Sequence, residues 1–165
     1  MTLFPTRAVL ALTAAVLTTP FAAADDAVQT PLVLGPVEQW QADPTVILEA
    51  VDVTLDDFRW LARPVVVFAD TPNDPRFQTQ IELLAARMED LAERDVVVLT
   101  DTDPEAFSSL REQLRPRGFM LVVLGKDGGV KLRKPVPWDV RELSRSIDKM
   151  PLREQEIRDR RALNQ

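Results

Sequence analysis

Residues 63–95 read RPVVVFADTPNDPRFQTQIELLAARMEDLAERD, and this stretch decides the fold. It opens with PVVVFA, residues 64–69, an apolar run rich in β-branched residues that is typical of a strand buried on both faces of a largely parallel sheet. Asp74 followed by Pro75 predicts a helix start, because Asp accepts from free amides and Pro fits the first turn. One apolar stripe then follows at helical spacing: Phe77, Ile81, Leu84, Met88 and Leu91. The stretch therefore predicts a buried strand, a corner at residues 70–74 and one long amphipathic helix.

The rest of the chain continues the alternation of strand and helix. Residues 95–100 predict a second strand, and Asp103-Pro104 starts a helix with Phe107, Leu110 and Leu114 on its apolar stripe. Residues 119–124 and 130–133 predict a hairpin around KDGG, and residues 140–150 a last helix. The order β-α-β-α-β-β-α, with an N-terminal helical extension, predicts a three-layer α/β/α fold with a mixed sheet of about four strands. This order resembles that of thioredoxin-like proteins.

The first residues have the layout of a cleavable secretory signal. A short segment with one positive charge, at Arg7, precedes the apolar run 8–23, and small residues lead to a cleavage site after Ala24. A membrane anchor is the alternative, but threonines and Pro20 interrupt the run, which is also short for a span. We therefore expect a periplasmic or secreted protein with no transmembrane anchor after signal cleavage.

Three further segments complete the predicted organisation. Residues 25–53 form a tether and N-terminal extension, in which residues 25 to about 45 have little fixed structure and residues 45–53 pack as helix or strand. Residues 54–152 form the domain, which begins with a short helix capped by Thr54. Residues 153–165 form a charged C-terminal tail, either a solvated helix or a frayed end.

Composition excludes several classes of function. The chain has a formal net charge of −6 and no long basic tract, which argues against nucleic acid as a partner. It contains no cysteine, histidine or tyrosine, so thiol redox chemistry, histidine bases and common zinc sites are excluded. We expect no cofactor, no resident metal and no catalytic residue, although an enzyme that uses carboxylates stays open.

The corner is the first candidate site. We expect polar residues from three segments to lie together there: the corner, the end of the second strand and the loop before the third strand. They are Asp70, Thr71, Asn73 and Asp74, then Asp101 and Asp103, then Arg115 and Arg117. The carboxylates suit a hard cation and a metal-dependent enzyme, but Asp74 and Asp103 also suit helix caps. The two arginines suit a small anionic ligand, or they pair with the same aspartates. The sequence leaves these alternatives open.

A second candidate lies near the C-terminus, in the docking segment Met150, Pro151, Arg153 and Glu156. Pro151 suits a helix boundary, whereas Arg153 and Glu156 would make a small charged face for a protein partner. Arg63 and Arg94 stand where strands begin, and pairing with nearby or C-terminal acids would maintain the fold. The three tryptophans fit core or edge packing, and an exposed one would mark a protein contact.

Four motifs carry a resemblance to a known family. They are Trp60-x-x-Arg63, ERDVVV at 93–98, LGKDGGVKLR at 124–133 and IDKMPLREQE at 147–156. Together they resemble the domain-of-unknown-function family 4174 (DUF4174), a thioredoxin-like and peroxiredoxin-like group that lacks the active-site cysteines and occurs in exported bacterial and secreted animal proteins. Where redox relatives carry those cysteines, this chain has TPNDP at 71–75. The resemblance implies a thioredoxin-like fold and an exported protein. With no cysteine in the chain, we expect a non-redox module of the cell envelope that binds an unidentified protein or a small anionic ligand.

Overall fold

A computed structural model describes residues 34–165, which are built around a five-stranded mixed sheet. The strands are β1 (Ile47–Glu49), β2 (Arg63–Phe68), β3 (Val96–Asp101), β4 (Met120–Leu124) and β5 (Val130–Lys134). They lie in the order β1-β3-β2-β4-β5. The first three are parallel, whereas β4 runs antiparallel to both β2 and β5. This order and these directions confirm the predicted thioredoxin-like fold.

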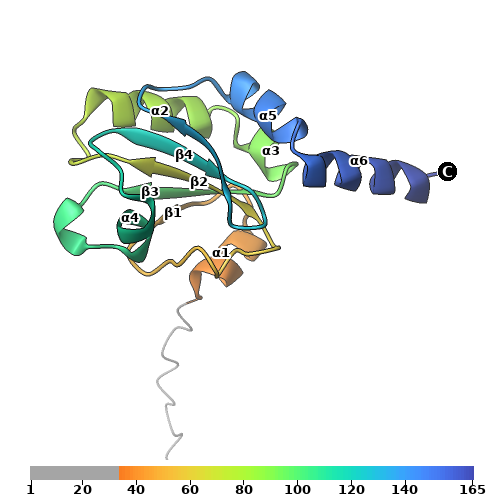
Figure 1. The fold of residues 1–165 in the computed structure, drawn as a ribbon, viewed down its shortest axis with the longest axis horizontal. Helices are drawn as coiled ribbons and strands as arrows, with labels where there is room; N and C mark the ends of the chain where they lie inside the picture. The colour runs from red at the N-terminus through yellow and green to blue at the C-terminus, as the bar shows by residue number, and fades with distance from the viewer. Residues whose placement is uncertain (1–33) are drawn as a thin grey trace, which may run out of the picture. The chain divides into compact units, whose positions relative to one another are not determined.

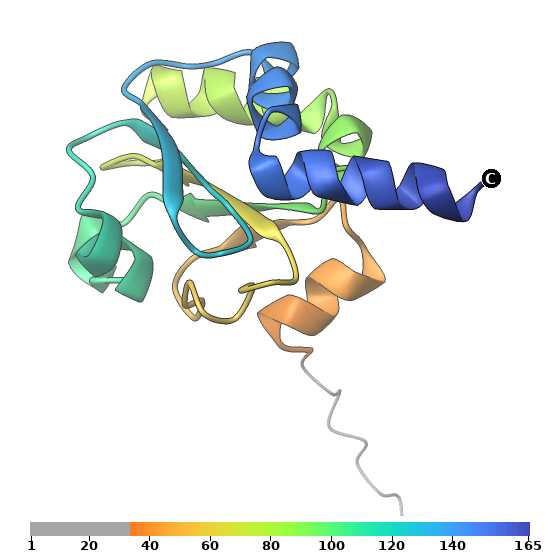
Figure 2. The same cartoon turned by 45° about the vertical axis from the view of Figure 1, so that its right-hand side comes forward.

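Helices cover both faces of the sheet (Figure 1). One face carries α2 (Pro75–Ala85), α3 (Met88–Ala92) and α5 (Val140–Asp148); the other carries α1 (Pro36–Ala42), the 3-10 turn η1 (Pro104–Ala106) and α4 (Ser109–Leu114). The last helix, α6 (Pro151–Leu163), begins beside the sheet and extends away from it (Figure 2). All six residues of β2 are buried, and the last four, residues 65–68, alternate between two hydrophobic cores. Three layers with a doubly covered central strand are therefore present, as predicted.

The fold begins earlier than the sequence predicted. Residues 36–42 form α1, so the expectation of little fixed structure is wrong there, and β1 adds a fifth strand by pairing with β3. Trp40 explains why α1 is held, because its indole donates to the Val96 carbonyl at 3.2 Å and packs edge-on against Phe58. The predicted signal, residues 1–24, and the first part of the tether lie outside the described residues.

Three helix predictions also need correction. Residues 55–61 form successive turns in place of a helix, and the Thr54 amide donates to the Asp57 carboxylate at 2.7 Å. The long helix divides into α2 and α3, since Arg87 leaves the helical region at φ −144°. Phe107 lies outside a buried stripe: it precedes the Ser108 cap of α4, has φ +48° and is 73% exposed.

Within residues 34–165, every helix falls short of the length or apolar character that a membrane span requires.

Candidate functional site

The predicted corner lies at the carboxyl edge of the sheet, where β2 and β3 end, and helix capping uses several of its polar groups. Asp74 caps α2 by accepting from the Arg76 amide at 2.8 Å, and its carboxylate also meets the Arg76 guanidinium at 2.7 Å. The hydrogen bond from Arg76 holds the pKa of Asp74 below its ordinary value. Asp103 caps η1 by accepting from the Glu105 amide at 2.9 Å. Both aspartates therefore have the capping role predicted for them.

Asp101 is buried at this edge and is fully engaged. It accepts from the Arg111 guanidinium at 2.6 Å and from the Ser108 hydroxyl. Arg111 also donates to the Ala69 carbonyl at 2.9 Å, so one side chain of α4 joins the ends of β2 and β3. Sequence reasoning missed Arg111 and Ser108, although the two stand three positions apart as cap and first turn of α4.

The remaining corner residues, Asp70, Thr71, Asn73 and Arg117, are exposed. Asp70 lies 3.7 Å from Arg111 and faces the loop before β4, because a Cβ at Gly118 would stand 3.6 Å from its carboxylate. Among residues 34–165, the predicted pairing of Arg117 with the aspartates is absent, and Arg76 and Arg111 take that role.

The carboxylates of this edge do not assemble into a metal site. A cavity of about 330 Å³ opens beside Asp101 and is lined by Glu49 and Asp103 among other residues. No group of three or more acidic side chains within residues 34–165 is placed to hold a metal ion. The described region therefore offers no support for the metal-dependent alternative.

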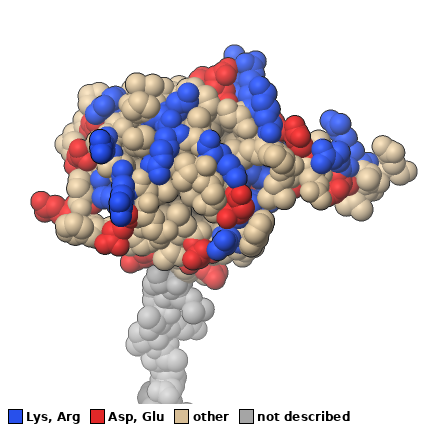
Figure 3. All heavy atoms as spheres, viewed as in Figure 1, with Lys and Arg blue, Asp and Glu red and all other residues tan. Residues whose placement is uncertain are grey.

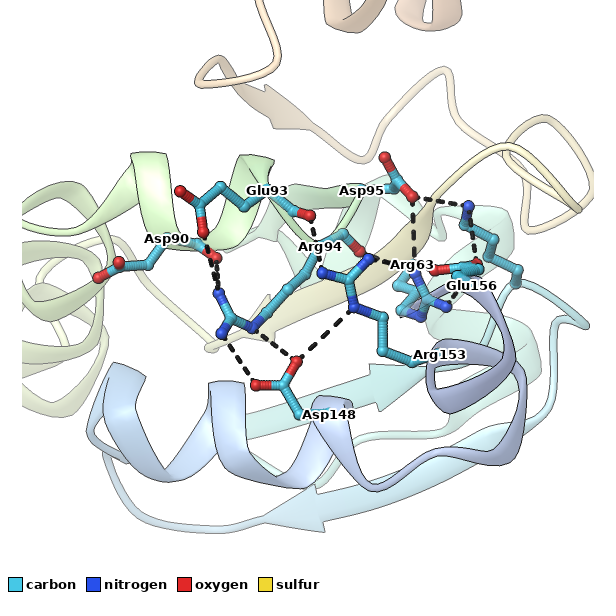
Figure 4. A network of polar contacts seen from close by, with 9 residues as sticks. Arg63, Asp90, Glu93, Arg94, Asp95, Asp148, Arg153 and Glu156 are labelled. Atoms are coloured by element: carbon cyan, nitrogen blue, oxygen red, sulfur yellow. Dashed lines mark hydrogen bonds and ion pairs between the residues drawn. The ribbon is translucent and has the colours of Figure 1, made fainter. Parts of the chain in front are cut away.

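The amino edge, where β2 and β3 begin, carries a network of charged side chains (Figure 4). Arg63 opens β2 with only 1% of its side chain exposed, and it donates to Glu156 at 2.8 Å and to the Arg94 carbonyl at 2.8 Å. Lys126 contacts Glu156 at 3.1 Å and Asp95 at 2.8 Å. Burial alone would raise the pKa of Glu156, but hydrogen bonds from Arg63 and Lys126 outweigh it and lower that pKa.

A second part of the network connects α5 and α6 to the residues that precede β3. The Arg94 guanidinium donates two hydrogen bonds to the Asp148 carboxylate, at 2.9 and 3.0 Å. The buried Arg153 donates to the Glu93 carbonyl at 3.0 Å and to Glu156 at 3.3 Å. The interpretation of the strand-entrance arginines as fold maintenance is confirmed. Arg153 and Glu156, predicted as docking residues, bind α6 to the sheet.

The other two predicted docking residues line an opening in the surface. A cavity of about 270 Å³ lies beside the start of α6, and we call it the Trp60 hollow; its lining includes Trp60, Lys126, Lys131, Met150, Pro151 and Leu152. Trp60 is 63% exposed and has φ +64°, a conformation that is strained for a bulky residue. Its amide donates to the Lys126 carbonyl at 2.7 Å, which fixes the turn. The hollow therefore combines an exposed aromatic ring with Met150 and Pro151.

Comparison with known protein families identifies the domain. DUF4174, a domain of unknown function, matches residues 54–156. The chain belongs to DUF4174. The DUF4174 region contains the corner, the charged network and every named residue of the Trp60 hollow. The resemblance inferred from the sequence motifs is thus confirmed.

Two solved structures are similar to the DUF4174 chain. Plasmodium yoelii thioredoxin peroxidase I is 17% identical, over 62% of this chain and 80% of that chain, with a TM-score of 0.45. Plasmodium yoelii Prx1a, modified at the N-terminus, is 17% identical over 62% of this chain and 81% of that chain, with a TM-score of 0.46. No curated protein matches the chain.

Proposed function

We propose that this DUF4174 protein is an exported, non-redox binding module of the cell envelope, and that a protein partner docks at the Trp60 hollow. Export rests on the predicted signal at residues 1–24. The absence of cysteine from the sequence removes the thiolate that a thioredoxin-like redox mechanism requires. The proposed role of the fold is therefore to present a surface that binds another protein.

The observation that carries the proposal is the position of Trp60. Aromatic residues anchor protein interfaces, because they bury a large apolar area and lose little conformational freedom. Trp60 is mostly exposed beside a cavity with apolar walls, at the start of a helix that the charged network fixes. A hollow with an exposed aromatic rim is suited to binding, and its lining contains no cysteine, serine, threonine or histidine.

The chain offers a matched control for testing this role. Phe107 is also an exposed aromatic with a left-handed backbone, but it lies at the carboxyl edge. Affinity capture from an envelope extract of the source organism should recover a partner with the wild type and with Phe107→Ala, and lose it with Trp60→Ala. Loss with Phe107→Ala, or with an Asn73→Ala/Arg117→Ala double variant, in place of Trp60→Ala would move the binding site to the corner.

A further inference from the structure

We infer that the Trp60 hollow receives a protein segment in which one large apolar side chain is flanked by carboxylates. This inference rests on the proposed function and specifies the chemistry of its partner. Three features of the amino edge carry it: the size of the hollow, the strain at Trp60, and the basic residues around the turn and strand β5.

The size of the hollow suits a single large side chain. Its volume of about 270 Å³ lies at the lower end of the range typical of ligand pockets, about 300–1,000 Å³. Trp60, Met150 and Leu152 supply apolar walls, so the occupant buries an apolar group there. A single large side chain projecting from a protein surface is the usual anchor of such a pocket.

The strained backbone of Trp60 is held by the bond from its amide to the Lys126 carbonyl, but the side chain gains little from this conformation. Glycine would adopt φ +64° at lower cost, since a Cβ destabilises the left-handed conformation. The indole also gains little burial, because most of its surface is exposed. Phe107 shares this left-handed and exposed character, and Trp60 differs from it in lining an apolar cavity, so the strain and the cavity together point to a binding role. Contact with a partner would supply the missing burial.

The charges beside the hollow select an acidic partner. Three basic residues, Arg63, Lys126 and Lys131, line the hollow against one acidic residue, Asp127, in a chain of net charge −6. On strand β5, which reads VKLRK, Lys131 is the basic residue in this lining, since Arg133 donates to the Leu114 carbonyl and Lys134 lies over the Trp138 ring. Lys and Arg side chains gather over the region of β4 and β5 (Figure 3). Lys131 meets Asp127 at 2.7 Å, but both side chains are well exposed, at 37% and 44%. Such a pair is weak, so Lys131 is free to exchange Asp127 for a carboxylate of the partner.

Basic residues on β5 have an alternative explanation, because charges on an edge strand discourage pairing with another sheet. That explanation accounts for Lys131 and Arg133 but leaves the strained, exposed Trp60 unexplained. The combination of apolar walls with an excess of basic residues in the lining of the hollow is what specifies a partner that is both apolar and acidic.

A displayed library of random peptides, selected on the whole chain and counter-selected on its Trp60→Ala variant, tests the inference. We expect enriched peptides to place Leu, Phe or another large apolar residue beside Asp or Glu. The best peptide should bind Trp60→Ala at least about tenfold more weakly. Lys131→Glu should weaken binding by about fivefold and reduce its salt dependence, whereas Phe107→Ala should leave it unchanged.

Several results would overturn the inference. Enrichment of basic or uncharged peptides would contradict the acidic partner, and so would enrichment that is independent of Trp60. Failure to enrich any peptide, together with self-association by sedimentation that Trp60→Ala abolishes, would assign the hollow to a second copy of the chain. Matching circular dichroism and urea midpoints of the variants exclude misfolding. If capture of an envelope protein depends on Trp60 but acidic peptides do not bind, the proposed function is supported and the inferred acidic chemistry of the partner is wrong.

Discussion

The two edges of the sheet use charge over very different distances in the chain. At the carboxyl edge, Asp101 pairs with Arg111, ten positions away, and the pair is complete within one loop and the helix that follows it. At the amino edge, Arg63 pairs with Glu156, 93 positions away, and the network holds the C-terminal helix. The carboxyl edge is where α/β folds usually bind ligands. Here its buried charges are satisfied locally, and the apolar opening lies at the opposite edge.

The largest effect on this comparison should come from Arg63. Arg63→Met removes a buried cation and leaves the Arg94 carbonyl without this donor, while Glu156 keeps Lys126 and Arg153. Breaking a buried pair by removing one member costs about 3–5 kcal/mol of unfolding free energy, and the remaining partners of Glu156 place the expected loss at the lower end, about 3 kcal/mol. Urea unfolding followed by tryptophan fluorescence measures the loss.

A double variant serves as the control for this prediction. Arg63→Met with Glu156→Gln removes both charges, so it should be less destabilised than the sum of the two single variants. Strict additivity would show that Arg63 and Glu156 contribute no coupling, and the amino edge would then be held by packing and by its other ion pairs.

A smaller loss is expected at the carboxyl edge. Asp101→Asn keeps the shape of the side chain but removes the charge that binds Arg111 and accepts from Ser108. Hydrogen bonds to charged groups contribute about 1.5–3 kcal/mol each, and we expect a loss of about 2–3 kcal/mol. Partner capture should survive in the folded variant. If Asp101→Asn folds normally but no longer captures the partner, the binding site would lie at the corner and not at the Trp60 hollow.

The sequence was a good guide to the elements because their signals are local. The apolar run at residues 64–69 and the caps Asp74 and Asp103 lie where predicted. Residues 45–53 were left open as helix or strand, because the three residues of β1 carry too little pattern and the pairing of β1 with β3 is a tertiary interaction. Phe107 was misplaced because its spacing to Leu110 fits a helix whose start is set by Ser108 instead.

The candidate site was less accessible to sequence reasoning for a related reason. That Arg63 pairs with a C-terminal acid was foreseeable, but the choice of Glu156 depends on where α6 begins. The left-handed backbone of Trp60 has no local signal, since neither glycine nor asparagine stands there. It arises from the bond between its amide and Lys126, which only the folded chain brings together.

The two edges should also differ in how their contribution to stability depends on pH. The pKa of Glu156 is lowered in the folded state, so its stabilising contribution is present above the ordinary glutamate pKa of about 4.3 and is lost as the pH falls through the folded value. Unfolding free energy measured from pH 6 downward should therefore decline below about pH 4.5. Glu156→Gln should flatten this decline.

Asp74→Asn is the matched variant at the carboxyl edge, where Arg76 lowers the pKa of an aspartate. Its pair lies at the surface, with the Arg76 side chain 52% exposed, so solvent screens it and the acid dependence should change less than in Glu156→Gln. A larger change in Asp74→Asn would reverse the order of the two edges.

The smallest expected change in stability tests the comparison most directly. Trp60→Gly and Phe107→Gly both relieve a left-handed backbone at an exposed aromatic, one at each edge. Each should leave the unfolding free energy unchanged or raise it by up to about 1 kcal/mol, because the strain removed offsets the added chain entropy. Only Trp60→Gly should abolish partner capture.

A loss of unfolding free energy above about 2 kcal/mol in Trp60→Gly would instead mean that the indole packs as a structural element. A variant that gains stability and loses binding would show that the strained tryptophan is retained for recognition.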